Sequence, residues 1–174
     1  MKFCAFLRGV NVNGTFMKMV DVCKVFSDAG MKEVSSVLAS GNIFFSSEKL
    51  SSELKIILEK AMSEYFNYEA FLFIKTEKEV KAIFENSPFQ KSDDAHIYAF
   101  VGTENSEKIL LEEFNRSQKA ENENAQIVEN IFYWQVSKGN TLDSAFGKIL
   151  GKKSLKDQIT SRNLNTIEKI VKKF

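Results

Sequence analysis

Apolar positions in the first half of the chain recur with two periods, one typical of helices and one typical of strands. The clearest helical repeat has the three- and four-residue spacings of one helix face and consists of Leu54, Ile57, Leu58, Ala61, Met62 and Tyr65. Short runs rich in apolar residues flank this segment, and Gly30 and the Ser40-Gly41 pair supply the breaks between elements. The pattern predicts the order βαββαβ. Its elements are expected at residues 2–8, 17–29, 33–39, 42–45, 51–66 and 69–74.

A similar order follows in the second half of the chain. A connecting helix begins with Thr76 and Glu79, which have the spacing of a capping box, and ends before Pro88. Further elements are expected at residues 96–101, 105–117, 125–129, 131–136, 142–150, 157–160 and 162–174. We therefore predict an α+β fold of two tandem ferredoxin-like (βαββαβ) halves with antiparallel sheets, joined by a helix and closed by a C-terminal helix. The predicted boundaries are 1–75, 76–95 and 96–174.

Composition is that of a globular protein with an uneven distribution of charge. The chain has 174 residues, of which 44% are hydrophobic, and a net charge of +1. This charge gives no general attraction to nucleic acid or to membranes. Residues 147–174 hold eight basic against two acidic side chains, a net +6, which leaves about −5 for the rest. Such a segment indicates either an anionic partner or a solvent-facing helix face.

The sequence contains few of the signals that mark a compartment or a cofactor. Cys4 and Cys23 fall on a predicted strand and a predicted helix, so reduced thiols and a cytoplasmic location are expected. No apolar run reaches about 18 residues, which predicts no membrane span. His96 is the only histidine, and nucleotide-binding glycine motifs are absent, so no metal or cofactor is predicted. No catalytic constellation is recognised, and enzymatic activity stays an open question.

Polar residues gather after the first predicted strand. Arg8 ends an apolar run, and Gly9 and Asn11 follow it in a loop. In a ferredoxin-like sheet, with spatial order 4-1-3-2, the end of the first strand and the turn between the second and third strands lie at one edge. We therefore expect this loop to lie beside the turn Ser40-Gly41-Asn42.

These residue types suit an anion. Arginine offers a planar fork of donors for carboxylate or phosphate, asparagine offers an amide, and glycine permits close approach of the backbone. The alternative is an ordinary turn in which Arg8 pairs with a nearby acid, and the sequence leaves both open.

A second polar group lies near the C-terminus. Thr160, Arg162 and Asn163 are expected at the start of the final helix, where hydroxyl and amide side chains are common caps. An arginine is not favoured there by the helix dipole, which suggests either a bound anion or an ion pair elsewhere.

The aromatic run Phe132-Tyr133-Trp134 is predicted to belong to the core.

Three motifs resemble the signatures of the DUF1697 family, mostly bacterial, cytosolic and uncharacterised proteins. They are Leu-Arg-Gly-Val-Asn-Val-Asn-Gly at residues 7–14, Ser-Gly-Asn-Ile at 40–43 and Thr-Ser-Arg-Asn-Leu-Asn-Thr at 160–166. The resemblance implies an α/β fold of ferredoxin-like halves and supplies no activity. Asn13 and Leu164 depart from the family pattern, which usually has glycine and tryptophan there. The matching signature positions are Arg8, Gly9, Asn11, Ser40, Gly41, Asn42, Thr160, Arg162, Asn163 and Thr166.

The functional hypothesis is therefore a cytosolic protein that binds a small anionic ligand, or a nucleotide phosphate, through these arginine-, asparagine- and glycine-containing segments. One alternative is an interaction module that pairs through a sheet edge or a helix face, as a monomer or weak homodimer. Another is a nucleic-acid-binding protein or an enzyme of unassigned reaction.

Overall fold

The computed structural model describes residues 1–10 and 17–174 and contains two four-stranded antiparallel sheets in these residues. The chain forms two compact units, residues 1–81 with 169–174 and residues 82–168. The first sheet has the order β2-β3-β1-β4 and the second the order β6-β7-β5-β8. Both are the ferredoxin-like order, so the predicted α+β fold of two such halves is confirmed. The elements are β1 (Lys2–Arg8), α1 (Met19–Asp28), β2 (Lys32–Ser36), β3 (Asn42–Ser46), α2 (Ser51–Phe66), β4 (Phe71–Thr76), α3 (Glu77–Glu85), β5 (Ala95–Gly102), α4 (Ser106–Arg116), β6 (Asn124–Val128), β7 (Ile131–Ser137), α5 (Ala145–Ile149), a short 3-10 turn (Lys153–Leu155), β8 (Ile159–Asn163) and α6 (Leu164–Val171).

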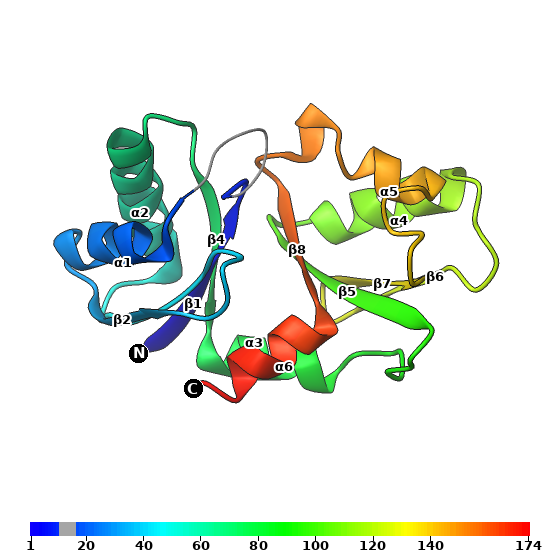
Figure 1. The fold of residues 1–174 in the computed structure, drawn as a ribbon, viewed down its shortest axis with the longest axis horizontal. Coiled ribbons are helices and arrows are strands. Elements are labelled where there is room, and N and C mark those ends of the chain that lie inside the picture. The colour runs from blue at the N-terminus through cyan, green and yellow to red at the C-terminus, as the bar shows by residue number, and fades with distance from the viewer. Residues whose placement is uncertain (11–16) are drawn as a thin grey trace. The chain divides into compact units, whose positions relative to one another are not determined.

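The core of the first unit lies between its sheet and two helices. Figure 1 shows α1 and α2 together on one face of this sheet. Strand β1 is central, and its alternate residues Phe3, Ala5 and Leu7 pack into the same cluster as Phe26 of α1 and Leu58 of α2. Burial of this apolar surface is the main force that holds the helices to the sheet.

Side chains of α2 also close the outer edge of the first sheet. Lys55, Glu59 and Ser63 are spaced four residues apart and therefore lie along one side of the helix. Glu59 accepts a hydrogen bond from the Leu72 amide at 3.0 Å, and Lys55 donates to the Leu72 carbonyl at 2.9 Å. Ser63 accepts from the Ala70 amide at 3.0 Å. These bonds occupy backbone groups that an edge strand otherwise offers to another strand.

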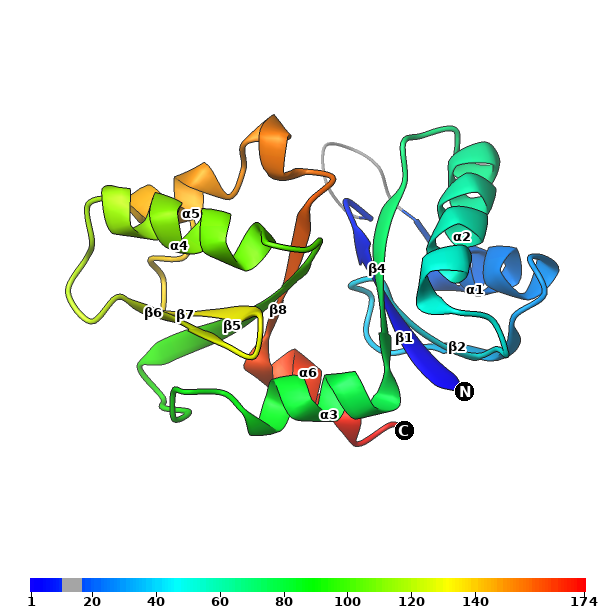
Figure 2. The same ribbon diagram turned by 180° about the vertical axis from the view of Figure 1, so that it is seen from behind.

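The second unit is built in the same way around aromatic side chains. Figure 2 shows α4 and α5 on one face of the second sheet. Phe132, Trp134 and Phe146 are almost fully buried there, with the Trp134 and Phe146 rings 5.2 Å apart. The Trp134 indole donates to Glu123 at 2.9 Å, which satisfies its polar atom. The prediction that residues 132–134 belong to the core is confirmed.

Local sequence signals account for several boundaries. Thr76 and Glu79 form the predicted capping box, since the Thr76 amide donates to the Glu79 carboxylate at 2.7 Å and the Glu79 amide donates to the Thr76 hydroxyl at 3.3 Å. Strands β6 and β7 are joined by Glu129 and Asn130, both with positive φ, as a two-residue hairpin turn of type I′ requires.

Two predicted boundaries are wrong for reasons that lie outside the local pattern. The second strand ends at Ser36 and not at residue 39, because the chain turns at Leu38, whose φ is +60°. The final helix begins at Leu164 and not at Arg162, because β8 continues to Asn163 by pairing with β5. Among the described residues, no helix has both the length and the hydropathy needed to cross a bilayer.

Candidate functional site

The end of β1 and the turn between β2 and β3 lie together at one end of the first sheet. The Leu7 amide donates to the Gly41 carbonyl at 2.8 Å, one step beyond the paired residues Phe6 and Asn42. A Cβ atom on Gly41 would lie 2.9 Å from a methyl carbon of Val10 and 3.0 Å from the Cβ of Leu7. Gly41 thus allows the two segments to pack closely.

Arg8 and Ser40 lie at this same end of the sheet. The β1–β3 pairing ends at Phe6 and Asn42, and alternation along β1 places Arg8 on the face that carries these two residues, while Ser40 belongs to the turn before β3. Asn42 is fully buried, and its side-chain nitrogen donates to Ser40 Oγ at 2.9 Å and to the Val37 carbonyl at 3.1 Å. Asn42 therefore fixes the turn and positions the Ser40 hydroxyl.

The Ser40 hydroxyl can still donate a hydrogen bond while it accepts the one from Asn42. Its oxygen accepts from Asn42, so its hydroxyl hydrogen is directed elsewhere, and the side chain is exposed. Arg8 is half-buried at the same end of the sheet. A guanidinium and a hydroxyl hydrogen are both donors, which is the chemistry that an oxyanion needs.

Gly9 extends this group of polar atoms, which we call the β1 rim: Arg8, Gly9, Ser40, Gly41 and Asn42. Gly9 has φ +75°, and no described atom lies within 4 Å of the position that a Cβ would take. As far as the described residues show, a ligand can therefore approach the backbone of Gly9 closely. The predicted contribution of Asn11 falls in residues 11–16 and lies outside the described residues.

Leu38 also belongs to this turn, although sequence reasoning placed it inside a strand. It has φ +60° and is 46% exposed. Leucine is a poor residue for the left-handed region, and such outliers are concentrated at binding loops and switches. No sequence signal could have indicated this, because an apolar residue after Val37 favours strand.

The second predicted group is not a loop at a helix start. Thr160 and Arg162 are buried residues of β8, opposite Val101 and Ala99 of β5. The Arg162 guanidinium donates to Thr160 Oγ1 at 2.9 Å and to the Ser161 carbonyl at 2.8 Å. These bonds hold the Arg162 side chain against its own strand. Thr160 and Arg162 lie on one face of β8 because they are two residues apart in a paired strand.

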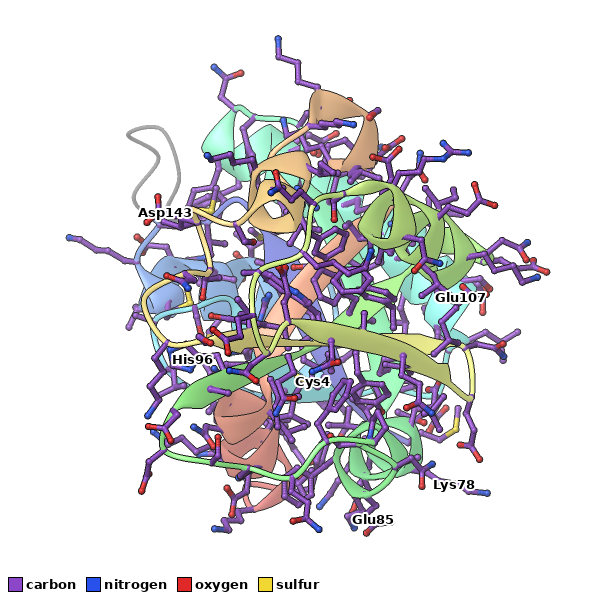
Figure 3. The ribbon with its side chains drawn as sticks, turned by 90° about the vertical axis from the view of Figure 1, so that its right-hand side faces the viewer. Cys4, Lys78, Glu85, His96, Glu107 and Asp143 are labelled. Carbon is purple, nitrogen blue, oxygen red and sulfur yellow. The ribbon has the colours of Figure 1, made fainter. Side chains whose placement is uncertain are left out.

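Asn163 keeps the predicted capping role and adds a contact with the single histidine. Its Oδ1 accepts from the Asn165 amide at 2.9 Å, as an N-cap of α6 should. Its Nδ2 then faces His96 Nδ1 at 3.1 Å, within hydrogen-bond distance. His96 lies at the start of β5, as Figure 3 shows.

A model of the family described as "Protein of unknown function (DUF1697)" matches residues 1–133, more than half of the chain. The chain belongs to the DUF1697 family. The matched range contains the β1 rim of this DUF1697 protein and ends before β8.

A solved structure supports the same fold over the full length. It is the conserved bacterial protein SP0830 from Streptococcus pneumoniae, with a TM-score of 0.79 and 22% sequence identity. The alignment covers 98% of this DUF1697 chain and 97% of that protein. At this identity the similarity establishes the fold. No curated protein matches the chain.

The basic C-terminal segment of the DUF1697 chain does not form one helix face. Its eight basic residues are divided between the two units, with Lys169, Lys172 and Lys173 in the first. Within the second unit, Lys152 pairs with Glu113 at 3.1 Å and Arg162 is buried. Of the eight, only Lys169 lies within α6, so the segment does not make a basic face of that helix.

Proposed function

We propose that this DUF1697 protein is a cytosolic binding protein for a small anionic ligand, such as a phosphate or carboxylate group, and that the β1 rim is its site. Arg8 provides the positive charge and Ser40 a hydroxyl donor. Gly9 provides a backbone that a ligand can approach, while Gly41 and Asn42 hold the turn in place. The observation that carries the proposal is the bond by which Asn42 orients Ser40, at the end of the sheet where β1 ends with Arg8.

Supporting features come from the chain that surrounds this group. The Met17 amide donates to the Val10 carbonyl at 3.3 Å, so the residues just before α1 lie beside the chain that follows Gly9. The positive end of the helix dipole at that position favours an anion. The left-handed Leu38 adds an exposed apolar side chain to the same turn, which suits a ligand with both an anionic and an apolar part.

Thr160, Arg162 and Asn163 have no direct role in this proposal. Their side chains make the bonds within β8 and with His96 and α6 described above. A nucleic-acid partner also has less support, because two of the basic C-terminal side chains are engaged within the second unit, Lys152 with Glu113 and Arg162 with Thr160. Thr160, Arg162 and Asn163 are proposed to stabilise the second unit.

The test is thermal unfolding in the presence of inorganic phosphate, pyrophosphate and ATP. A ligand at about 100 times its dissociation constant stabilises the folded state by about 2.7 kcal/mol. For a protein of this size we expect a rise in Tm of roughly 5–10 °C for at least one of these anions.

Variants connect any shift to the rim. Arg8→Ala should abolish the stabilisation, and Arg8→Lys should retain part of it because lysine keeps the charge but loses the planar fork. Arg116→Ala is the matched control, since Arg116 is an exposed arginine on α4. Absence of a shift with all three anions, or an undiminished shift in Arg8→Ala, would overturn the proposal.

A further inference from the structure

A pocket of about 220 Å³ lies at the opposite end of the first sheet from the β1 rim. Its walls come from the start of β1, from β2 and β3, and from the residues that follow α6. Lys2 lines this pocket, whereas Arg8, at the other end of the same strand, belongs to the rim. The volume is below the roughly 300–1,000 Å³ of pockets for drug-sized ligands, so an occupant must be small.

One wall of the pocket is held in place by contacts between the two ends of the chain. Both ends lie in the first unit, where Figures 1 and 2 mark them. The Phe174 ring meets the Phe44 ring edge to face, with centroids 4.7 Å apart. The Lys2 ammonium donates to the Phe174 backbone oxygen at 3.1 Å. Phe44 and Phe174 thus provide a fixed aromatic surface.

Glu33, the acidic residue of this pocket, has an unusual backbone conformation. Glu33 has φ +53° and lies where the register between β2 and β3 shifts, between Lys32 and Ser35. A β-bulge of this kind turns a side chain in a new direction, and it is frequent beside binding sites. Ser46 donates to Glu33 Oε2 at 2.5 Å, which orients the carboxylate.

The pocket therefore carries both signs of charge around an aromatic surface. Its lining includes two basic residues, Lys2 and Lys173, and one acidic residue, Glu33. A purely anionic ligand would face Glu33, and a purely cationic one would face two lysines. We propose that this pocket binds a small zwitterion with an apolar side group, the class to which aromatic α-amino acids belong.

In this arrangement each part of the ligand has a partner of opposite character. The ligand ammonium pairs with Glu33, and the ligand carboxylate pairs with Lys2 and Lys173. The apolar side group packs against Phe44 and Phe174. The site is independent of the anion site at the β1 rim, because the two share no residue.

The test is an NMR titration of the isotope-labelled full chain with three probes. L-phenylalanine is the zwitterion, 3-phenylpropanoate lacks its ammonium group, and 2-phenylethylamine lacks its carboxylate. We expect L-phenylalanine at millimolar concentration to shift the amide signals of Glu33, Ser46 and Phe174. Each analogue should bind at least about tenfold more weakly, because one charge-assisted contact is lost.

Matched variants assign the contacts. Glu33→Gln should weaken L-phenylalanine binding about tenfold, whereas Glu48→Gln, at an exposed residue outside the pocket, should not. Lys173→Ala should weaken it while Lys169→Ala, likewise exposed and outside the pocket, should not. The proposal fails if L-phenylalanine shifts none of these signals. It also fails if either analogue binds as tightly as L-phenylalanine.

Discussion

Gly41 combines a left-handed backbone with close neighbours, and both restrict what can replace it. Its φ is +69°, and an added Cβ would meet Val10 at 2.9 Å. Gly139 has φ +89° but no described atom within 4 Å of its Cβ position. The two residues therefore separate the cost of the backbone conformation from the cost of crowding.

We predict that Gly41→Ala lowers the free energy of unfolding by about 2–3 kcal/mol, because backbone strain and displacement of Val10 act together. Gly139→Ala should lower it by about 1 kcal/mol, from backbone strain alone. Urea denaturation of both variants measures the difference. Equal losses would show that Val10 gives way without cost.

Two buried tyrosine hydroxyls differ in their partners. Tyr133 donates to the Ile83 carbonyl at 2.8 Å, whereas the buried hydroxyl of Tyr68 has no hydrogen-bond partner within the described chain. At neutral pH we predict that Tyr133→Phe costs about 1 kcal/mol, since it leaves a carbonyl unpaired. Tyr68→Phe should be neutral or stabilising. Chemical denaturation at pH 7 compares them.

Tyr68 also predicts how stability depends on pH. Burial, with a smaller effect of Glu59, raises the pKa of Tyr68 from 10.0 to about 12. Between these values the unfolded chain loses the phenolic proton while the folded chain keeps it, so stability falls as pH rises. Tyr68→Phe lacks this proton. The free energy of unfolding of the variant should therefore increase relative to wild type from pH 10 to 12, and a constant difference would contradict the assignment.

At the scale of elements, the α2–β4 contact explains how an edge strand is kept from pairing. We predict that Glu59→Ala increases the rate of hydrogen exchange at the Leu72 amide, because this amide loses its acceptor. Glu64→Ala, at an exposed position of the same helix, is the control. Exchange measured by NMR should change in the first variant only. Equal protection in both would mean that another group covers the Leu72 amide.

At the scale of the whole molecule, the two edge strands of the first sheet argue against assembly through that sheet. Side chains of α2 bond the Leu72 amide and carbonyl of β4. In β2, a shift of register next to the charged Glu33 interrupts the strand. We predict a monomer, or at most a weakly associating dimer, in sedimentation velocity experiments. A stable dimer at low concentration would show that another surface, such as β6 or a helix face, mediates assembly.

Much of the fold was predictable because its signals are local. Helical and strand periods, the Thr76–Glu79 capping box and the break at Gly30 each depend on residues close in sequence. The β1 rim was predictable in one respect, since the ferredoxin-like order brings the end of β1 to the β2–β3 turn. The role of Asn42 was not predictable, because the sequence alone allows its amide to face a ligand. In the structure the amide bonds Ser40 and Val37 instead.

The sequence by itself determined the order of elements and the family signatures, because periodicity and motif spacing are properties of short segments. Tertiary structure alone decided the position of Arg162, which pairing with a distant strand moved from a helix start into β8. It also decided the pocket at the start of β1, where Phe174 meets Phe44 from the other end of the chain. Contacts of this kind leave no pattern along the sequence, since their partners are brought together only when the chain folds.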